Sequence, residues 1–293
     1  MVPDYLKLKE IKPALCGYIR EAQFKLDPDE TPDDIVVHDV RVLMKKSRAT
    51  VRLLKSQLDE ESFNREYSAL REVGRIMRSW RETSVHRKLL KYLKKKYPAL
   101  FSNLTDNVKI NMLLTKHISE KAPSPEMKKD IENIIGLLHK SDYRWRFRSM
   151  SSLDPHLLLK ELEITFNSVA GSYLKARNYP KSVNVHEFRK ITKDFLYQLY
   201  YFRSLKPKVI KDLEKRLDNI AQNLGKYNDH SVLIRALDYK YPSAENSSAV
   251  DELMVLIKKE QDSYLMRVWP AAFKIFRPGQ RMPNVLGFKV LAI

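Results

Sequence analysis

The sequence predicts an all-α protein, on the strength of three observations. Only 7 of its 293 residues are Gly, while Leu, Lys, Arg and Glu, which favour helices, are abundant. Apolar residues recur at helical spacing, and strand-like alternation is almost absent. Turn-forming stretches divide the chain into segments of a length typical of helical bundles. With 43% hydrophobic residues, such segments can bury one large or two modest cores.

The expected helices are separated by stretches rich in Pro, Asn, Asp and Ser. The first and fourth of these stretches place Asp before Pro, a pair that suits the start of a helix, so we expect helices to begin at Asp27–Pro28 and Asp154–Pro155. Residues 271–293 alternate Pro, Gly and apolar residues without a period, and this tail receives no assignment. The breaks are 27–34, 97–107, 121–126, 151–155, 178–182, 240–248 and 277–283.

The segment 37–58 predicts a helix with one buried face and one cationic face. After Asp39 it has no acidic residue until Asp59. Such a helix lacks the i,i+4 ion pairs between acidic and basic residues that usually stabilise an exposed face, and its positive charges repel one another. We expect an anion outside the helix to offset this repulsion. The cationic face comprises His38, Arg41, Lys45, Arg48, Arg52 and Lys55, and the apolar stripe comprises Val40, Leu43, Ser47, Val51, Leu54 and Leu58.

An internal repeat relates the two halves of the chain. VHDVRVLMKK at 37–46 recurs as VHEFRKITKD at 185–194, and WRETSV at 80–85 aligns with YNDHSV at 227–232 at nearly the same offset. Near-equal offsets over this length indicate duplication. We therefore expect two helical domains of usual size, residues 1–150 and residues 151–293, the second ending in a short irregular tail.

Net charge and cysteine content limit the partners and the compartment. A formal charge of +18 and a pI near 9.7 require a polyanionic partner: nucleic acid, an anionic membrane surface or another polyanion. The single cysteine, Cys16, excludes an internal disulfide and a thiolate metal site and indicates a reducing compartment. No apolar run is long enough to cross a bilayer, and the first ten residues are too charged to begin a signal peptide. We expect a cytoplasmic protein that does not bind a membrane.

The repeated histidines, His38 and His186, admit several interpretations. Each has an Arg at i+3 where a metal site would want a second ligand. The carboxylates of Asp39 and Glu187 are turned about 100° away, which makes joint acid–base catalysis unfavourable. A buried imidazole that bonds a helix end is the structural alternative. Recurrence beside cations favours a phosphate-facing role instead. The sequence predicts no catalytic residue, no metal and no cofactor.

A second cationic series, at Arg71, Arg75 and Arg78, also occupies one helical face. Rows of cations about 5 Å apart along a helix suit a linear polyanion. Nucleic acid is one candidate, yet the cationic face of 37–58 lacks the aromatic residues on which bases stack. Tyr200 and the aromatic–Arg cluster at 143–148 favour nucleic acid, although helical spacing places half of that cluster in the core. A polyanion without bases fits better, and RNA or DNA remains the alternative.

These motifs resemble the CHAD (conserved histidine α-helical) domain family. The run His38-x-x-Arg41-x-x-x-Lys45-Lys46-x-Arg48 matches its signature, and a weaker version follows His186. The pairs Arg81–Glu82 and Asn228–Asp229 end the next helix of each half. The second half departs from the pattern at Asp194 and Leu196, so we expect the first half to contribute more.

The resemblance implies a fold and a function. It implies two four-helix bundles related by a pseudo-twofold axis, with basic helices lining a central groove or pore. It also implies non-enzymatic binding of inorganic polyphosphate and association with polyphosphate granules. No segment resembles the triphosphate-tunnel barrel that is fused to some relatives, and the oligomeric state stays open. The expected binding residues are His38, Arg41, Lys45, Lys46, Arg48, Arg52, Arg71, Arg75, Arg78, His186, Arg189, Lys190 and Lys193.

Overall fold

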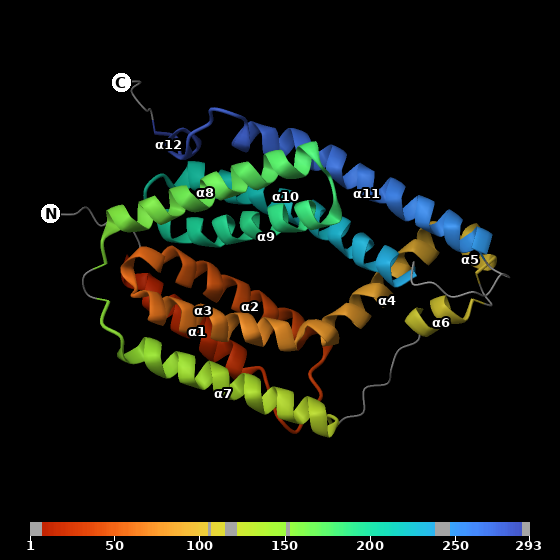
Figure 1. Cartoon of the computed structure of the whole chain (residues 1–293), viewed down its shortest axis with the longest axis horizontal. Helices are drawn as coiled ribbons and strands as arrows, with labels where there is room; N and C mark the ends of the chain where they lie inside the picture. Colours follow the sequence, from red (N-terminus) through yellow and green to blue (C-terminus); the bar gives the residue numbers. More distant parts are fainter. Residues whose placement is uncertain (1–7, 105–106, 115–121, 151–152, 238–246, 289–293) are drawn as a thin grey trace.

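The protein is all-α, and its helices form two neighbouring groups (Figure 1). The computed structural model describes residues 8–104, 107–114, 122–150, 153–237 and 247–288, and no strand occurs in these ranges. The α-helices are α1 (Leu8–Phe24), α2 (Asp34–Leu53), α3 (Glu60–Ile76), α4 (Arg78–Lys96), α5 (Pro98–Ser102), α6 (Val108–Leu114), α7 (Pro125–Phe147), α8 (Pro155–Asn178), α9 (Ser182–Leu199), α10 (Pro207–Leu237), α11 (Ser247–Phe276) and α12 (Met282–Val285). Short 3₁₀ turns η1 (Lys55–Gln57) and η2 (Tyr200–Phe202) follow α2 and α9.

Helices α2 and α9 join the two groups. In the first group α2 packs against α1 and α3, and α7 packs against the same two helices on their other side. In the second, α9 packs against α8 and α10, and α11 lies along α10 (Figure 1). Because α2 also contacts α9, one continuous core runs through both groups. It includes the fully buried Leu53 and Met44 of α2 and Phe188 and Phe195 of α9.

A second, smaller core lies at the far end of α4. Helix α4 leaves the first group and contacts α10, α5 and α6 (Figure 1). Leu90 and Leu93 of α4 pack there with Leu233 of α10 and Leu253 of α11. This crossing ties the two halves of the chain together at a second place.

The predicted helix starts are right at one Asp–Pro pair and wrong at the other. Asp154 caps α8, accepting from the amide of His156 at 2.8 Å, and Pro155 is the first helical residue. At 27–34 the helix begins later than expected, at Asp34. Asp27 instead accepts from the amide of Asp29 in a turn, and Asp33 caps α2.

Of the other breaks, 97–107 is only partly right, because it contains the short helix α5 (Pro98–Ser102). The rest agree with the sequence where the structure describes them. Helix α7 begins at Pro125, α8 gives way to α9 between Asn178 and Ser182, and α11 ends at Phe276. The unassigned tail contains the end of α11 and the short helix α12. Most of the break at 240–248 lies outside the described residues.

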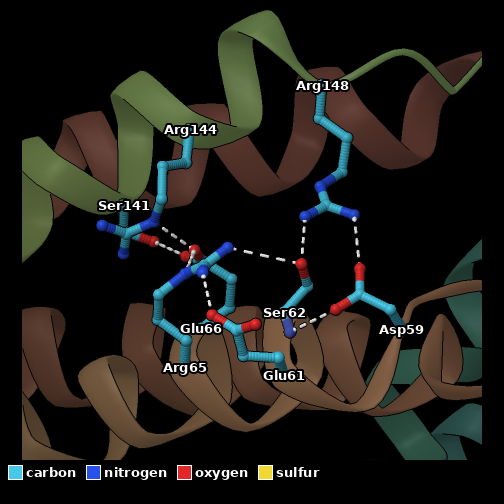
Figure 2. A network of polar contacts seen from close by, with 8 residues as sticks. All are labelled: Asp59, Glu61, Ser62, Arg65, Glu66, Ser141, Arg144 and Arg148. Carbon is cyan, nitrogen blue, oxygen red and sulfur yellow. Dashed lines mark hydrogen bonds and ion pairs between the residues drawn. The ribbon is translucent and has the colours of Figure 1, made fainter.

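A buried carboxylate fastens α3 to α7 (Figure 2). Glu66 is only 2% exposed and accepts from the hydroxyl of Ser141 at 2.7 Å and from Nε of Arg144. Arg65 adds a second cationic contact, at 3.6 Å. A buried carboxylate is tolerated when its lone pairs are satisfied in this way, so the network fixes how α7 lies on α3.

Candidate binding site: a basic cluster between α2 and α9

The apolar stripe predicted on 37–58 is buried, and it turns the cations of α2 towards α9. Val40, Leu43, Ser47, Val51 and Leu54 are all buried, while Leu58 is partly buried. The helix itself ends at Leu53, so Lys55 lies in η1 rather than on α2. The cationic residues Arg41, Lys45, Arg48 and Arg52 are half-buried, as expected of side chains beside a packed neighbouring helix.

Five of these cations form what we call the α2–α9 basic cluster: Arg41, Lys45 and Arg48 of α2, with Arg189 and Lys193 of α9. Lys45 lies within it. Burial, followed by the charges of Arg189, Arg41, Arg48 and Lys193, lowers the pKa of Lys45 to about 7. The four charges that act most strongly on this amine are therefore all positive.

Three members of the cluster are held in place by their surroundings. Arg41 donates from Nη1 to the carbonyl oxygen of Gly74 at 2.6 Å. The guanidinium of Arg189 lies against Gly225 of α10. If Gly225 had a Cβ atom, that atom would lie 3.3 Å from Nε of Arg189. Any larger residue at Gly225 would crowd the guanidinium. Lys193 bonds Asp218 at 3.0 Å and lies 5.4 Å from the ring of Tyr197.

The cluster also contains buried donors that the protein does not use. Nε of Arg48 and Nε of Arg189 are buried and have no hydrogen-bond partner among the described residues. Leaving a buried donor unsatisfied costs on the order of 1–3 kcal/mol, and more when the group is charged. Both of these donors belong to the cluster around Lys45.

Arg52, the last cation of α2, is paired with a carboxylate of α9. Asp194 of α9 is buried and forms an ion pair with Arg52. Arg52 also donates to the hydroxyl of Tyr67, whose ring lies 5.1 Å from its guanidinium. Arg52, predicted as a binding residue, is thus engaged within the protein. The departure from the cationic pattern at Asp194 corresponds to a contact between the two halves of the chain.

The remaining predicted residues surround the cluster or lie away from it. Arg71 is exposed on the face of α3 that carries Tyr67 and Gly74, and both of these contact cations of α2. The expectation that Arg71, Arg75 and Arg78 share one helical face is wrong, because α3 ends at Ile76 and Arg78 begins α4. Arg75 forms two hydrogen bonds with Glu72, at 2.6 and 2.7 Å. Arg75 and exposed Arg78 line an open pocket of about 510 Å³ with Ile76, Ser79 and Asp130.

The two histidines are exposed, which disagrees with a buried structural role. His186 shares a hydrogen bond between Nδ1 and Oδ1 of Asn228 at 2.9 Å. Partial desolvation and then the charges of Arg189 and Lys190 lower the pKa of His186, against the opposing effect of Asn228. Neighbouring Lys190 pairs with Glu187 at 2.8 Å.

Lys46, the next residue after Lys45, lies 5.3 Å from the ring of Tyr18. Asp39 pairs with Lys25, as its turned position on the helix predicts. The two motif pairs do not end a helix, contrary to expectation: residues 81 and 82 lie near the start of α4, and Asn228 and Asp229 lie inside α10. The side chains of Arg81 and Glu82 lie outside the described part of the structure.

Three neighbours of the cluster were not predicted as part of the site: Tyr197, Asp218 and Gly225. Tyr197 is signalled in the sequence, since it follows Lys193 by four residues and shares its helical face. Burial raises the pKa of Tyr197 to about 12, so it stays neutral and can act as a donor. Asp218 and Gly225 carry no such signal, because they reach the cluster only through the packing of α10 on α9.

Within the described ranges, no group of three or more His, Cys, Asp or Glu side chains is arranged to hold a metal ion. The described helices also include none that is both long enough and apolar enough to span a membrane. The site is thus defined by guanidinium and ammonium groups.

These features define a class of all-helical protein in which two basic helices meet at a cluster of cations. The family model for the CHAD domain matches residues 20–238, three quarters of the chain, and the protein belongs to this family. The match includes α2, α9 and α10, which contribute or surround the cluster. No curated protein matches the chain.

Proposed function

We propose that the protein binds inorganic polyphosphate through the α2–α9 basic cluster and does not process it. The observation that carries this proposal is the convergence on Lys45 of four further positive charges from two helices. Phosphate oxygens would accept from the Arg and Lys side chains in charge-assisted hydrogen bonds. The association of the CHAD family with polyphosphate supports the same ligand.

We further propose that the two halves are related by an internal repeat, with the cluster in a groove or pore between two bundles. The helix boundaries support this, since α2 begins at Asp34 and α9 begins 148 residues later, at Ser182. Arg41 and Arg189 have the same offset, and each contacts a glycine on the following helix. A linear ligand in such a groove would meet cations from both halves.

Binding without catalysis follows from the chemistry of the residues that surround Lys45. Guanidinium and ammonium groups attract phosphates and donate to them, whereas hydrolysis requires a positioned base or carboxylates that hold a metal. The two carboxylates beside the cluster, Asp194 and Asp218, are each paired with a cation. In the cell, we propose that the protein is cytoplasmic and associates with polyphosphate granules.

A competition titration tests the ligand class. Labelled long-chain polyphosphate is bound at about 150 mM salt, where weak surface electrostatics are screened. It is then challenged with tRNA, single-stranded DNA and short phosphate oligomers. The proposal predicts that only phosphate chains compete, and that they compete better as they lengthen. Equal competition by tRNA or DNA would instead make nucleic acid the ligand of the same basic surface.

A further inference from the structure

We infer that Lys45 is a site of covalent acylation by acyl phosphates. The inference rests in part on the proposed function, because the cations that would hold a polyphosphate chain would also hold the phosphate of the acyl donor. It goes further in assigning a nucleophile and a reaction to one residue of the cluster. Two independent properties of the site support it.

The first property is nucleophilicity, which an amine has only when it is uncharged. Burial and the charges of Arg189, Arg41, Arg48 and Lys193 lower the pKa of Lys45 to about 7, so the free amine is well populated at neutral pH. An ordinary lysine, with a pKa near 10.4, has only about one amine in two thousand uncharged at that pH. Lys45 as a whole residue is partly buried and is not sealed inside the core.

The second property is a surrounding set of permanent cations that suits a phosphate leaving group. Guanidinium groups keep their charge at any physiological pH. Nε of Arg48 and Nε of Arg189 are buried donors without a partner in the described structure, and Arg41 is fixed by Gly74. The three guanidinium groups would attract the phosphate of the donor, and their positive charge would stabilise the charge that develops on it as the acyl group leaves.

The reaction is balanced without a further reactant. The nitrogen lone pair of Lys45 attacks the acyl carbon, and the bond from that carbon to the phosphate oxygen breaks. An amide forms, inorganic phosphate leaves, and the proton lost from the amine passes to the phosphate. The amide in the product cannot carry the positive charge of the lysine amine, so acylation would weaken polyanion binding at the cluster.

The test compares rates at individual lysines in the full chain. The protein is treated with acetyl phosphate between about pH 6 and pH 9, a range that spans the pKa of Lys45. It is then unfolded, and the remaining amines are capped with deuterated acetic anhydride. Mass spectrometry reads the light-to-heavy ratio at each lysine. Exposed Lys258 of α11 serves as the reference.

We expect Lys45 to react at least about tenfold faster than Lys258 at pH 7, with a rate that levels off above its own pKa. A neutral reagent, N-hydroxysuccinimidyl acetate, should show a smaller preference, since it carries no phosphate. Arg189→Gln should reduce the preference for Lys45, while Lys211→Gln, which removes one charge from an exposed position of α10, should not. Circular dichroism confirms that both variants are folded.

Equal rates at Lys45 and Lys258 would overturn the inference, as would an equal preference with the neutral reagent. Repeating the reaction with excess long-chain polyphosphate tests the inference and the proposed function separately. If it slows acylation of Lys45, both are supported. If Lys45 reacts selectively but polyphosphate gives no protection, the inference stands and the proposed binding site is wrong. If Lys45 is unreactive while polyphosphate binds at the cluster, only the inference fails.

Discussion

At the scale of single residues, Lys45 shows how the protein holds charges that repel one another. Burial and the charges of four cations lower the pKa of its amine to about 7, so the amine can lose its charge and relieve the repulsion. Arg41 and Arg48 have no such option, because a guanidinium does not deprotonate. The resulting charge is costly for the free protein and favourable for a bound anion.

Affinity for polyphosphate should therefore depend on pH through Lys45. A bound phosphate chain favours the charged amine, so the complex takes up a proton, and affinity should fall roughly two- to tenfold between about pH 6 and pH 8. Calorimetry in buffers of different ionisation enthalpy measures that uptake. Lys45→Arg keeps its charge throughout, and its affinity should be nearly flat over the same interval. A parent protein with no proton uptake would contradict this role for Lys45.

Most of the residues in the cluster could be predicted from sequence. Arg41, Lys45 and Arg48 follow from helical spacing and from the absence of acids between them, and Arg189 and Lys193 follow from the repeat. The pairing of Arg75 with Glu72 was missed, although an i,i+3 pair can be seen in the sequence. The pairing of Arg52 with Asp194 could not be predicted, because it depends on how α2 crosses α9.

At the scale of helices, the Arg52–Asp194 ion pair connects the two groups of helices. Asp194 is buried and Arg52 is partly buried, so solvent screens the pair only weakly. A double-mutant cycle with Arg52→Gln and Asp194→Asn should give a coupling of about 1–3 kcal/mol in the free energy of unfolding. Chemical denaturation measures it.

The exposed pair Lys190–Glu187 provides the control for that cycle. Both side chains are more than two-fifths exposed, so the same treatment with Lys190→Gln and Glu187→Gln should give at most about 0.5 kcal/mol. Equal couplings for the two pairs would show that Arg52 and Asp194 do not hold α2 against α9.

Glu66 should have a comparable role between α3 and α7 (Figure 2). Glu66→Gln removes a buried charge that Arg144 and Ser141 satisfy, and the free energy of unfolding should fall by about 1–3 kcal/mol. Glu61→Gln is the matched control, since Glu61 is 87% exposed and pairs with Arg65 at 3.2 Å on the helix surface. Its effect should stay within about 0.5 kcal/mol. Similar losses in both variants would contradict the importance of burial.

The break between α3 and α4 illustrates what sequence periodicity misses. The corresponding part of the second half is one continuous helix, α10, whereas the first half is interrupted at Met77. Arg41 donates to the carbonyl of Gly74, which the amide of residue 78 would use in an unbroken helix. A side-chain donor that competes for this carbonyl favours a break, and it comes from another helix.

At the scale of the whole molecule, the helical class could be predicted from the sequence, whereas the continuous core could not. The core depends on contacts between α2 and α9 and on the passage of α4 to α10. Both are long-range packing choices that helix propensity does not encode. The division of the chain at residue 150 remains a prediction.

The net charge of +18 attracts any polyanion at long range. The dependence of the binding affinity on salt concentration indicates how many ionic contacts the bound ligand makes. If the five cations of the cluster each neutralise one phosphate, the logarithm of the affinity should fall against the logarithm of salt with a slope of about −3.5 to −4.5. Binding titrations at several salt concentrations give the slope. A slope near zero would exclude an ion-exchange mechanism.

The measurement that tests the central claim most directly is the affinity of long-chain polyphosphate for two variants of equal charge. One carries Arg41→Gln, Arg48→Gln and Arg189→Gln in the cluster. The other carries Lys211→Gln, Lys215→Gln and Lys258→Gln at exposed positions of α10 and α11. At about 150 mM salt, we predict a loss of at least about tenfold for the first and less than about twofold for the second. Equal losses would contradict the claim, since they would make the ligand respond to net charge rather than to the cluster between α2 and α9.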